Sequence, residues 1–446
     1  MGDRYLIIPS ENRTREFDAK LLTACCAVEA GYGAIVGCRR DIHLSIDRLP
    51  RSIYIGKDLR ASSARMMRIL TRLGHRIVAW DEEGLVYYTP EHYLAARVDA
   101  SVLDACSLLL AWGGDNAEIW RNAAQYDGTP IHEVGNPRID LLRSELHSFH
   151  QPEIDAIKRR FGRYILVNSN FGSVNHVLPD GASATFRRLS SDRAADYQKG
   201  ALQHRRILFE RFLDAVPALA EAFPDQAIVV RPHPSENPLP WELVAQRHRN
   251  VHIRHEGGIV PWLMEAEAIV HNGCTTAVEG AILGRRAISY QPIVDDMYDI
   301  PLPNALSDIA PDLDTLIDLL RRPRRNIPGD CAAILRRHVA SLDGPLSSDR
   351  VIAAIETLTP PKRQGAGLLR TLRGSIQAGR RRRSKIAATD IVGHKDGDAY
   401  NAHRFPPISL AEVQARITQL RQCLGRFDQV GVRCLQPNVF ELRRAA

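Results

Sequence analysis

Three carboxylates stand in a row at Asp81, Glu82 and Glu83, between an apolar run and Gly84. Close like charges raise the pKa of at least one carboxyl group. A carboxyl group with a raised pKa suits a general base or a nucleophile, so we predict Glu83 and Glu82 as catalytic residues. An acidic surface turn closed by Gly84 explains the same residues without any chemistry.

Charged side chains of both signs follow other apolar runs in the first part of the chain. They are Glu11, Arg13, Arg15, Lys57 and Asp115, the last of which comes directly after Trp112-Gly113-Gly114. A rim of basic and acidic groups suits an anionic or polyhydroxyl ligand, and we predict that these residues face an acceptor. Taken singly, each residue is also explained by a solvated surface.

A histidine in the second part of the chain has a stiff backbone around it. His233 lies between two prolines and follows Arg231, which ends the apolar run 227–230. Proline fixes the backbone, and an imidazole or guanidinium held there can neutralise a phosphate oxygen. We therefore predict Arg231 and His233 as phosphate-binding residues. A proline-rich turn with an incidental histidine is the alternative.

A hydroxyl-rich helix start follows the apolar run 268–270. The residues are His271-Asn272-Gly273-Cys274-Thr275-Thr276, and a helical pattern continues to 283. Free backbone N–H groups at a helix start favour anions, and the two threonines add donors. We predict Asn272, Thr275, Thr276 and Glu279 as nucleotide-binding, with Glu279 on a ribose hydroxyl. A capping box between Thr276 and Glu279 is the structural alternative.

Metal ligation receives little support from the sequence. Asp312-Leu313-Asp314 and Asp396-Gly397-Asp398 have the Asp-x-Asp spacing of metal-dependent sugar transferases. The first pair opens a predicted helix, where capping explains it, and the second lies in a polar tail. The eight cysteines show no CxxC or zinc spacing, which predicts buried reduced thiols. We predict metal-independent chemistry and no cofactor.

The elements that must position these residues alternate between strands and helices. Strands are predicted at 5–8, 52–55, 76–80, 107–111, 130–134, 164–167, 227–230, 251–253, 268–270 and 287–290, and helices at 17–30, 62–73, 117–126, 201–223, 276–283 and 409–424. This alternation predicts an α/β fold with parallel sheets covered on both faces. Ligands bind beyond the carboxyl ends of such strands, and the polar stretch 168–196 is long enough for an active-site loop.

The pattern restarts once, which predicts two Rossmann-like domains facing a cleft. We place an acceptor-side domain at 1–150 and a nucleotide-donor domain at 151–345. Residues 346–446 change in composition and are predicted as a basic linker with a C-terminal helical extension. The helix and linker expected at 141–163 join the two domains.

Bulk composition narrows the class of protein. The chain has 446 residues, 44% of them hydrophobic and 25% charged, with a net charge of +7. No apolar run reaches the roughly eighteen residues of a membrane span, and the first residues lack a signal-peptide pattern, so we expect a cytoplasmic protein. The basic segment from Arg370 to Lys385 suits an anionic membrane surface or a solvated loop. No nucleic-acid-binding motif accompanies it.

Several of these motifs together resemble bacterial transferases of the GT-B fold that use CMP-linked sugars, including sialyltransferases, polysialyltransferases and capsule Kdo transferases. The shared motifs are Glu82-Glu83-Gly84, His233-Pro234 and Thr275-Thr276. More broadly, the chain resembles bacterial surface carbohydrate biosynthesis proteins of capsule and lipopolysaccharide. The segments concerned are Glu11 to Leu22, Asp81 to Leu85, Gly135 to Leu142, Val167 to Phe171, His271 to Glu279 and His403-Arg404-Phe405-Pro406.

The resemblance implies a glycosyltransferase that moves a sugar from a nucleotide donor to a growing polysaccharide or lipid-linked acceptor. Glu83 matches the second acidic position of the first motif, and Glu82 is the competing residue. His233 and the Thr275-Thr276 turn would bind the donor phosphate. The sequence departs from the motifs by having Glu at both acidic positions and Asn-Gly-Cys before the threonines, which leaves the donor sugar open. A CDP-glycerol-type polyol-phosphate transferase, a UDP-sugar epimerase and a non-catalytic scaffold are the alternatives.

Overall fold

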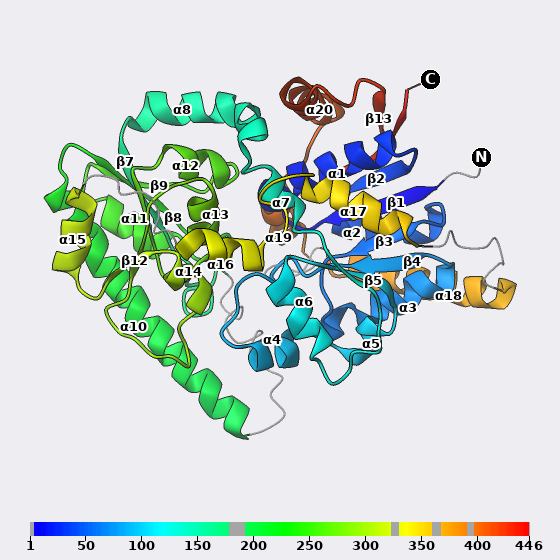
Figure 1. The fold of residues 1–446 in the computed structure, drawn as a ribbon, viewed down its shortest axis with the longest axis horizontal. Coiled ribbons are helices and arrows are strands. Elements are labelled where there is room, and N and C mark those ends of the chain that lie inside the picture. Colours follow the sequence, from blue (N-terminus) through cyan, green and yellow to red (C-terminus); the bar gives the residue numbers. More distant parts are fainter. Residues whose placement is uncertain (1–3, 178–191, 323–329, 359–366, 390–396, 446) are drawn as a thin grey trace. The chain divides into compact units, whose positions relative to one another are not determined.

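The computed structural model describes residues 4–177, 192–322, 330–358, 367–389 and 397–445. The chain folds into two compact units (Figure 1). Unit 1 comprises residues 1–85, 89–149 and 336–446, and unit 2 comprises residues 86–88 and 150–335. No helix in the described ranges is long and apolar enough to cross a membrane.

Unit 1 is built on an eight-stranded sheet. Six strands are parallel, in the order β2 (Gly33–Cys38), β1 (Tyr5–Ser10), β3 (Ile53–Gly56), β4 (Arg76–Ala79), β5 (Cys106–Ala111) and β6 (Ile131–Glu133). Its helices are α1 (Asp18–Glu29), α2 (Arg39–Leu44), α3 (Ala64–Leu73), α4 (Pro90–Arg97), α5 (Ala100–Leu103), α6 (Gly114–Arg121) and α7 (Pro137–Asp140), with a π-helical turn η1 (Arg13–Phe17) before α1. The direction of the strand order reverses between β1 and β3, where a doubly wound sheet has its ligand crevice.

The C-terminal residues belong to unit 1. They form α17 (Ser347–Glu356), α18 (Leu368–Ile386), α19 (Asp398–Arg404), α20 (Leu410–Leu424), β13 (Val430–Gln436) and β14 (Val439–Arg444). β14 pairs antiparallel with β2, and β13 pairs with β14. Asp140, at the end of α7, accepts hydrogen bonds from the backbone N–H groups of Ser347 at 2.6 Å and Ser348 at 2.8 Å, which fixes the start of α17.

The predicted separate extension at 346–446 therefore differs from the structure. Its apolar residues complete the core of unit 1, where Phe405 packs edge-on against Phe17 at a centroid distance of 5.8 Å and Phe440 does so at 6.4 Å. The segment Val-Phe-Glu-Leu at 439–442 is long enough only for a short strand. Its pairing partner β2 lies about 400 residues earlier in the chain. Such long-range pairing leaves no local signal.

Unit 2 contains a six-stranded sheet that is wholly parallel. The strand order is β9 (Val251–Ile253), β8 (Ala227–Arg231), β7 (Tyr164–Asn168), β10 (Ala268–His271), β11 (Ala287–Tyr290) and β12 (Asp308–Ala310). Its helices are α8 (Gln151–Phe161), α10 (Asp192–Ala222), α11 (Leu239–Ala245), α12 (Val260–Glu265), α13 (Thr275–Ile282), α14 (Pro301–Ala305) and α15 (Leu313–Arg321), while α16 (Asp330–His338) spans the boundary of the two units. In chain order this is the 3-2-1-4-5-6 arrangement of the dinucleotide-binding sheet.

Both faces of the unit 2 sheet are buried. Ile165 and Val167 of β7 pack with Phe212 of α10, whereas Tyr164 and Leu166 pack with Trp262 of α12 on the other face. Strand side chains alternate between faces, so a strand covered on both sides reads as a continuous apolar run. This explains why strands β7 to β11 could be predicted from apolar runs in the sequence.

The predicted α/β class with two Rossmann-like sheets is confirmed. Strands β2, β12, β13 and β14 were not predicted, and neither were several helices, including α2, α4, α11, α12 and α17. Part of the predicted loop at 168–196 lies outside the described residues, and α10 already begins at Asp192. The predicted linker at 141–163 is mostly helical, with η4 (Ser144–His150) leading into α8.

Replacing Gly37 by alanine tests whether the C-terminal hairpin is part of unit 1. Gly37 has a φ of 154°, and a Cβ there would collide with the carbonyl oxygen of Asn438, beside β14. We expect Gly37→Ala to lower the free energy of unfolding by about 1–3 kcal/mol through overpacking and to speed proteolysis of the C-terminal hairpin. Gly162→Ala is the control, because it also has a positive φ but open space around its Cβ position. Equal proteolysis of the two variants would contradict this placement of β14.

Candidate functional site

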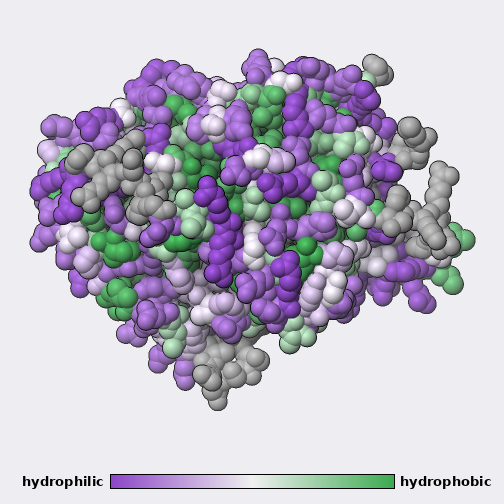
Figure 2. All heavy atoms as spheres, in the orientation of Figure 1, coloured by the Kyte–Doolittle hydropathy of each residue, from purple (hydrophilic) through white to green (hydrophobic). Residues whose placement is uncertain are grey.

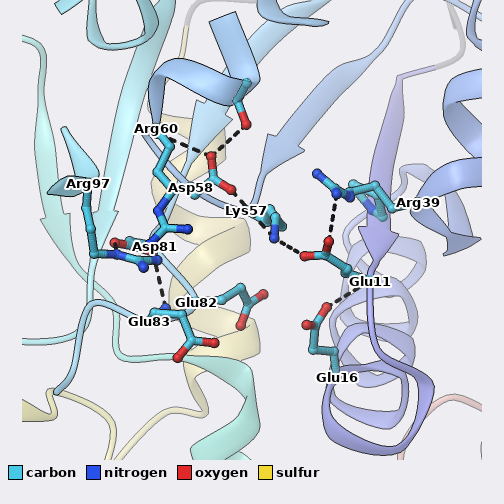
Figure 3. Close-up of polar contacts among 12 residues, drawn as sticks. Glu11, Glu16, Arg39, Lys57, Asp58, Arg60, Asp81, Glu82, Glu83 and Arg97 are labelled. Atoms are coloured by element: carbon cyan, nitrogen blue, oxygen red, sulfur yellow. Dashed lines mark hydrogen bonds and ion pairs between the residues drawn. The ribbon is translucent and has the colours of Figure 1, made fainter. Parts of the chain in front are cut away.

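The acidic run after β4 is neutralised residue by residue. Asp81 is fully buried and pairs with the Arg97 guanidinium, whose Nε lies 2.6 Å from Asp81 Oδ2. Glu82 is buried and lies 2.8 Å from the Lys20 ammonium. Glu83 pairs with Arg15 of η1. Figure 3 shows the three carboxylates pointing in different directions from one turn.

Lys20 connects this run to the first strand. It is buried in α1, and its Nζ lies 3.0 Å from Glu16 Oε2 and donates to the Pro9 carbonyl at 2.8 Å. Burial lowers the pKa of Lys20, but the adjacent Glu16 and Glu82 carboxylates outweigh it and raise the pKa. The ammonium therefore stays charged and holds two carboxylates in place below the surface.

Glu83 is the accessible carboxylate of the run, because 41% of its side chain is exposed. Desolvation tends to raise its pKa, but Arg15 and then Arg138 and Arg97 hold the pKa of Glu83 well below its usual range. The predicted upward shift through crowding is therefore not found at Glu83, because a cation accompanies each carboxylate. Glu83 is an anion at neutral pH, which suits a nucleophile or an electrostatic role better than a general base.

A second cluster lies at the reversal of strand order between β1 and β3. Glu11, just after β1, contacts Lys57 after β3, Arg39 at 2.7 Å and Arg404 of α19 at 2.8 Å. Figure 3 shows the contacts of Glu11 with Lys57 and Arg39. The backbone N–H of Glu11 also donates to Glu16 at 2.8 Å, which joins this cluster to Lys20 and Glu82. Three cations around one carboxylate leave this edge positively charged.

Two of the predicted acceptor-side residues contact other partners. The Arg13 guanidinium contacts Glu412 of α20 at 2.7 Å and the Pro406 carbonyl at 3.4 Å. Asp115, in the first turn of α6, lies 3.5 Å from Arg337 and 3.7 Å from His338. The structure therefore brings together Glu11, Arg15, Lys57, Glu82 and Glu83. Arg39 and Arg404 were missed as site residues; Arg404 carried only the signal of the His-Arg-Phe-Pro segment.

Unit 2 leaves polar groups unsatisfied at its own reversal of strand order, between β7 and β10. Asn168 ends β7 beside His271, its register partner at the end of β10. Three buried side chains there have atoms without a hydrogen-bond partner among the described residues: Asn168 Nδ2, both polar atoms of Asn272, and Thr276 Oγ1. A buried polar group without a partner lowers the stability of the fold by about 1–3 kcal/mol. Binding of a ligand that supplies hydrogen-bond partners would therefore be favoured here.

His271 holds the turn that presents Asn272. Its Nδ1 accepts from the Gly273 N–H at 3.0 Å, so its Nε2 carries the proton toward Ser307 Oγ at 2.8 Å. Burial lowers the pKa of His271 to about 3. Gly273 has a φ of 75°, a backbone conformation that side chains rarely adopt. The neutral imidazole thus fixes the turn before α13.

The start of α13 does not contain the capping box that was the structural alternative for Thr276 and Glu279. Cys274 is the N-cap residue and makes no side-chain cap bond, and Thr276 already lies inside the helix. Thr276 thus lies two residues after the cap position, and its hydroxyl remains available to a ligand. Thr275 is the first residue of the helix and is half-buried, while Glu279 is buried one turn further on. This geometry favours the anion-binding interpretation of the helix start.

His233 is oriented by its own loop. Its Nδ1 lies 2.7 Å from Ser235 Oγ and accepts from the Ser235 N–H at 3.2 Å, which places the proton of the neutral ring on Nε2. Glu236 accepts from the His233 N–H at 3.0 Å, the Phe171 N–H at 2.9 Å and the Ser169 hydroxyl at 2.9 Å. Glu236 therefore ties the loop after β8 to the loop after β7. Asn168, Ser169 and Glu236 were not predicted as site residues, although Asn168 and Ser169 directly follow a predicted strand and Glu236 lies in the loop after another.

Arg231 has a structural environment rather than a phosphate-facing one. Its guanidinium donates to the carbonyls of Glu256 at 2.9 Å and Gly257 at 3.0 Å and lies over the Trp262 ring at 4.9 Å. Burial lowers the pKa of Arg231 to about 10. These contacts occupy the side chain that the sequence assigned to phosphate.

No group of three or more potential metal-ligating residues gathers within the described part of the chain. Asp312 is the N-cap of α15 and accepts from the Thr315 N–H at 2.7 Å, as predicted. Asp398 pairs with Arg40 at 3.1 Å, and Asp396 lies outside the described residues. The described cysteines are free, and five of the eight are buried.

Acid should destabilise unit 2 through His271. Its pKa is about 3 in the folded chain and about 6.5 when unfolded, so the unfolded state binds more protons as the pH falls below about 6.5. We expect a loss of about 2 kcal/mol at pH 5 from this residue alone. Denaturant titrations of the wild type and His271→Asn at pH 7 and pH 5 measure it. The amide also accepts from Gly273 but does not titrate, so an identical pH dependence in both proteins would refute the assignment.

Comparison with known proteins gives structural neighbours only. No protein-family model matches the chain, and no curated protein matches it by sequence. A UDP-GlcNAc 2-epimerase from Methanocaldococcus jannaschii, in complex with UDP-GlcNAc and UDP, has 12% identity and a TM-score of 0.48, over 80% of this chain and 100% of its own. A putative UDP-N-acetylglucosamine 2-epimerase from Listeria monocytogenes has 13% identity and a TM-score of 0.49, over 80% and 96%. The wall teichoic acid polymerase TagF, soaked with CDPG, has 10% identity and a TM-score of 0.43, over 85% and 89%. Likeness at this level does not identify a donor or a reaction.

Proposed function

We propose that the protein is a metal-independent glycosyltransferase that moves a sugar from a nucleotide donor, CMP-linked in type, to a surface polysaccharide or lipid-linked acceptor. The observation that carries the proposal is the set of unsatisfied buried groups at the strand reversal of unit 2, formed by Asn168, Asn272 and Thr276. They lie where a sheet of this order binds nucleotides, at a helix start that favours phosphate.

The donor phosphate would lie against the first turn of α13. Backbone N–H groups and the Thr276 hydroxyl would donate to its oxygens, and His233 Nε2–H would donate from the neighbouring loop. When the bond between the sugar and the phosphate breaks, the electron pair leaves with the phosphate. Fixed donors aimed at that developing charge lower the barrier without needing to reorganise. Glu236 supports this by holding the His233 loop.

Glu83 is the proposed catalytic carboxylate, and Glu82 is its structural neighbour. Glu83 is partly exposed, whereas Glu82 is buried against Lys20. Glu83 either attacks the anomeric carbon and forms a glycosyl ester, which the acceptor hydroxyl then displaces while its proton passes to the departed phosphate, so that two inversions give net retention. Alternatively, it accepts the proton of the acceptor hydroxyl as that oxygen displaces the phosphate, which gives inversion. Its lowered pKa favours the first role. The positively charged edge around Glu11 and Lys57 would receive an anionic acceptor.

The setting of this reaction is the cytoplasmic side of the cell envelope. Surface polysaccharides and their lipid-linked precursors are large and poorly diffusing acceptors, so an enzyme that acts on them benefits from proximity to the membrane. The basic helix α18, which contains Arg370 to Lys385, would provide that proximity. Nucleotide and acceptor are the partners that this proposal requires.

Nucleotide binding is tested by thermal shift with CMP, CDP, UDP and GDP. Ligands that bind the native state raise the Tm by mass action. At a ligand concentration of 100 times Kd, the native state is stabilised by about 2.7 kcal/mol. We expect the largest shift with CMP and its loss in His233→Ala and Asn272→Ala. His248→Ala is the matched control, because His248 lies in the same unit between α11 and β9.

Other outcomes of this screen favour other functions. A larger shift with CDP, followed by binding of CDP-glycerol, would favour a polyol-phosphate transferase. A preference for UDP would favour a UDP-sugar epimerase. Absence of any shift would overturn the donor site and leave a non-catalytic scaffold.

The two glutamates should respond differently to conversion to glutamine. We expect Glu83→Gln to lower kcat by about 10²–10⁴-fold with a small change in Tm, because the side chain is partly exposed. Glu82→Gln should instead lower the free energy of unfolding by about 3–5 kcal/mol, because Lys20 loses a buried partner. Transfer rates and unfolding curves for both variants measure this. A Glu83→Gln enzyme with the wild-type rate would rule out its catalytic role.

A further inference from the structure

Helix α18 packs on unit 1 with one narrow face. It lies beside α3 and also contacts α2, as Figure 1 shows in orange. The packed face contains Gly374, where a Cβ would meet Arg72 and Leu73 of α3 at 3.1 Å, and the buried Ala378. Arg382 donates to Asp47 at 2.9 Å and to the Leu44 carbonyl at 3.0 Å. These contacts fix the rotation of the helix about its axis.

The opposite face of α18 exposes large apolar side chains. Leu368, Leu369, Leu372 and Ile376 are 91%, 75%, 57% and 47% exposed. At about 100° per residue, these positions fall within one sector of the helix surface, roughly 100° wide. Figure 2 shows apolar side chains at the right edge of the view, where Figure 1 places α18. A contiguous exposed patch of this kind marks an interaction surface.

The charges of α18 are all of one sign. The helix contains seven basic residues and no acidic one. Arg373, Arg380 and Arg383 are exposed on the same outward side as the leucines, whereas Arg382 is used by Asp47. The first three turns thus present leucine and isoleucine together with Arg373, and the last two present Arg380 and Arg383, with Ile386 at the end.

We propose that α18 is an in-plane membrane anchor that lies flat on an anionic lipid bilayer. Its leucines would enter the boundary between headgroups and acyl chains, and its arginines would contact lipid phosphates. This combination of an apolar sector with arginines is that of interfacial helices, and clustered basic residues attract the anionic leaflet. The phosphates of a nucleic acid would bind the arginines, but its phosphate backbone has no apolar surface to bury the leucines.

This inference deepens the proposed function, on which its biological meaning rests, because it names the surface on which the enzyme works. Binding to vesicles needs neither donor nor acceptor. Failure of the anchor would leave the nucleotide shifts unchanged, and failure of the nucleotide shifts would leave vesicle binding unchanged. The two proposals can therefore be refuted separately.

The test is co-sedimentation of the full-length protein with vesicles of phosphatidylglycerol and phosphatidylcholine in equal parts. We expect binding to these vesicles at low salt, with little binding to pure phosphatidylcholine. The apolar variant Leu369→Gln/Leu372→Gln/Ile376→Gln should reduce the partition coefficient at least about 100-fold. The charge variant Arg380→Gln/Arg383→Gln should reduce it about 30-fold, since each basic residue near the surface contributes about fivefold.

Matched controls come from unit 2. Leu239 and Leu243 of α11 are also about half exposed, at 52% and 51%, and Arg247 and Arg249 are exposed just after that helix. Leu239→Gln/Leu243→Gln and Arg247→Gln/Arg249→Gln should bind vesicles like the wild type. Because all the replaced side chains are exposed, each variant should keep the wild-type Tm, which is measured alongside.

Four results would overturn the proposal. The wild type does not sediment with anionic vesicles, or the α18 and α11 variants lose binding equally. Alternatively, the apolar variant keeps vesicle binding but changes from dimer to monomer by light scattering, which would make this face a contact between two copies. Salt-dependent binding to an RNA duplex that needs the arginines but not the leucines would assign the helix to nucleic acid instead.

Discussion

The buried ammonium of Lys20 is the interaction on which the acidic end of unit 1 depends. It is buried between Glu16 and Glu82, and the carboxylates of these two described residues balance its charge. Removing one partner of such a buried set costs about 3–5 kcal/mol. With Glu82 held in this way and Asp81 held by Arg97, Glu83 alone of the three projects toward the surface. A buried network thus leaves one carboxylate of the run accessible.

At the carboxyl ends of its strands, unit 2 has buried polar groups that lack hydrogen-bond partners in the described residues. Its strand ends leave the amide of Asn272 and the hydroxyl of Thr276 without partners in the described residues, although both are buried. Its loops are nevertheless rigid, because Glu236 and His271 each hold a turn through backbone N–H groups. A site that is fixed but unsatisfied can bind a ligand without first reorganising. Unit 1 therefore offers a carboxylate held among cations, and unit 2 offers buried donors and an acceptor that a ligand could satisfy.

The C-terminal residues affect both the stability and the chemistry of unit 1. Phe405 and Phe440 pack on Phe17 at the start of α1, and Arg404, next to Phe405, reaches Glu11 at the strand reversal. The same segment then leads into α20, where Glu412 pairs with Arg13. Core packing and electrostatics are thereby linked, because moving the aromatic contact would also withdraw a cation from the edge of the sheet.

The α/β class, most of the parallel strands and the placement of Glu83, His233, Asn272 and Thr276 after strands could be predicted from local sequence. Strands buried on both faces are continuous apolar runs, and the candidate site residues lie in the segments that follow them, so both signals are local. Tertiary structure decided what depends on distant partners: the pairing of β14 with β2, the capture of Glu82 by Lys20, the use of Arg231 by the Glu256 and Gly257 carbonyls, and the arrival of Arg404 at Glu11. The pKa of Glu83 is one consequence, because crowding along the sequence raises it, whereas cations brought by folding lower it.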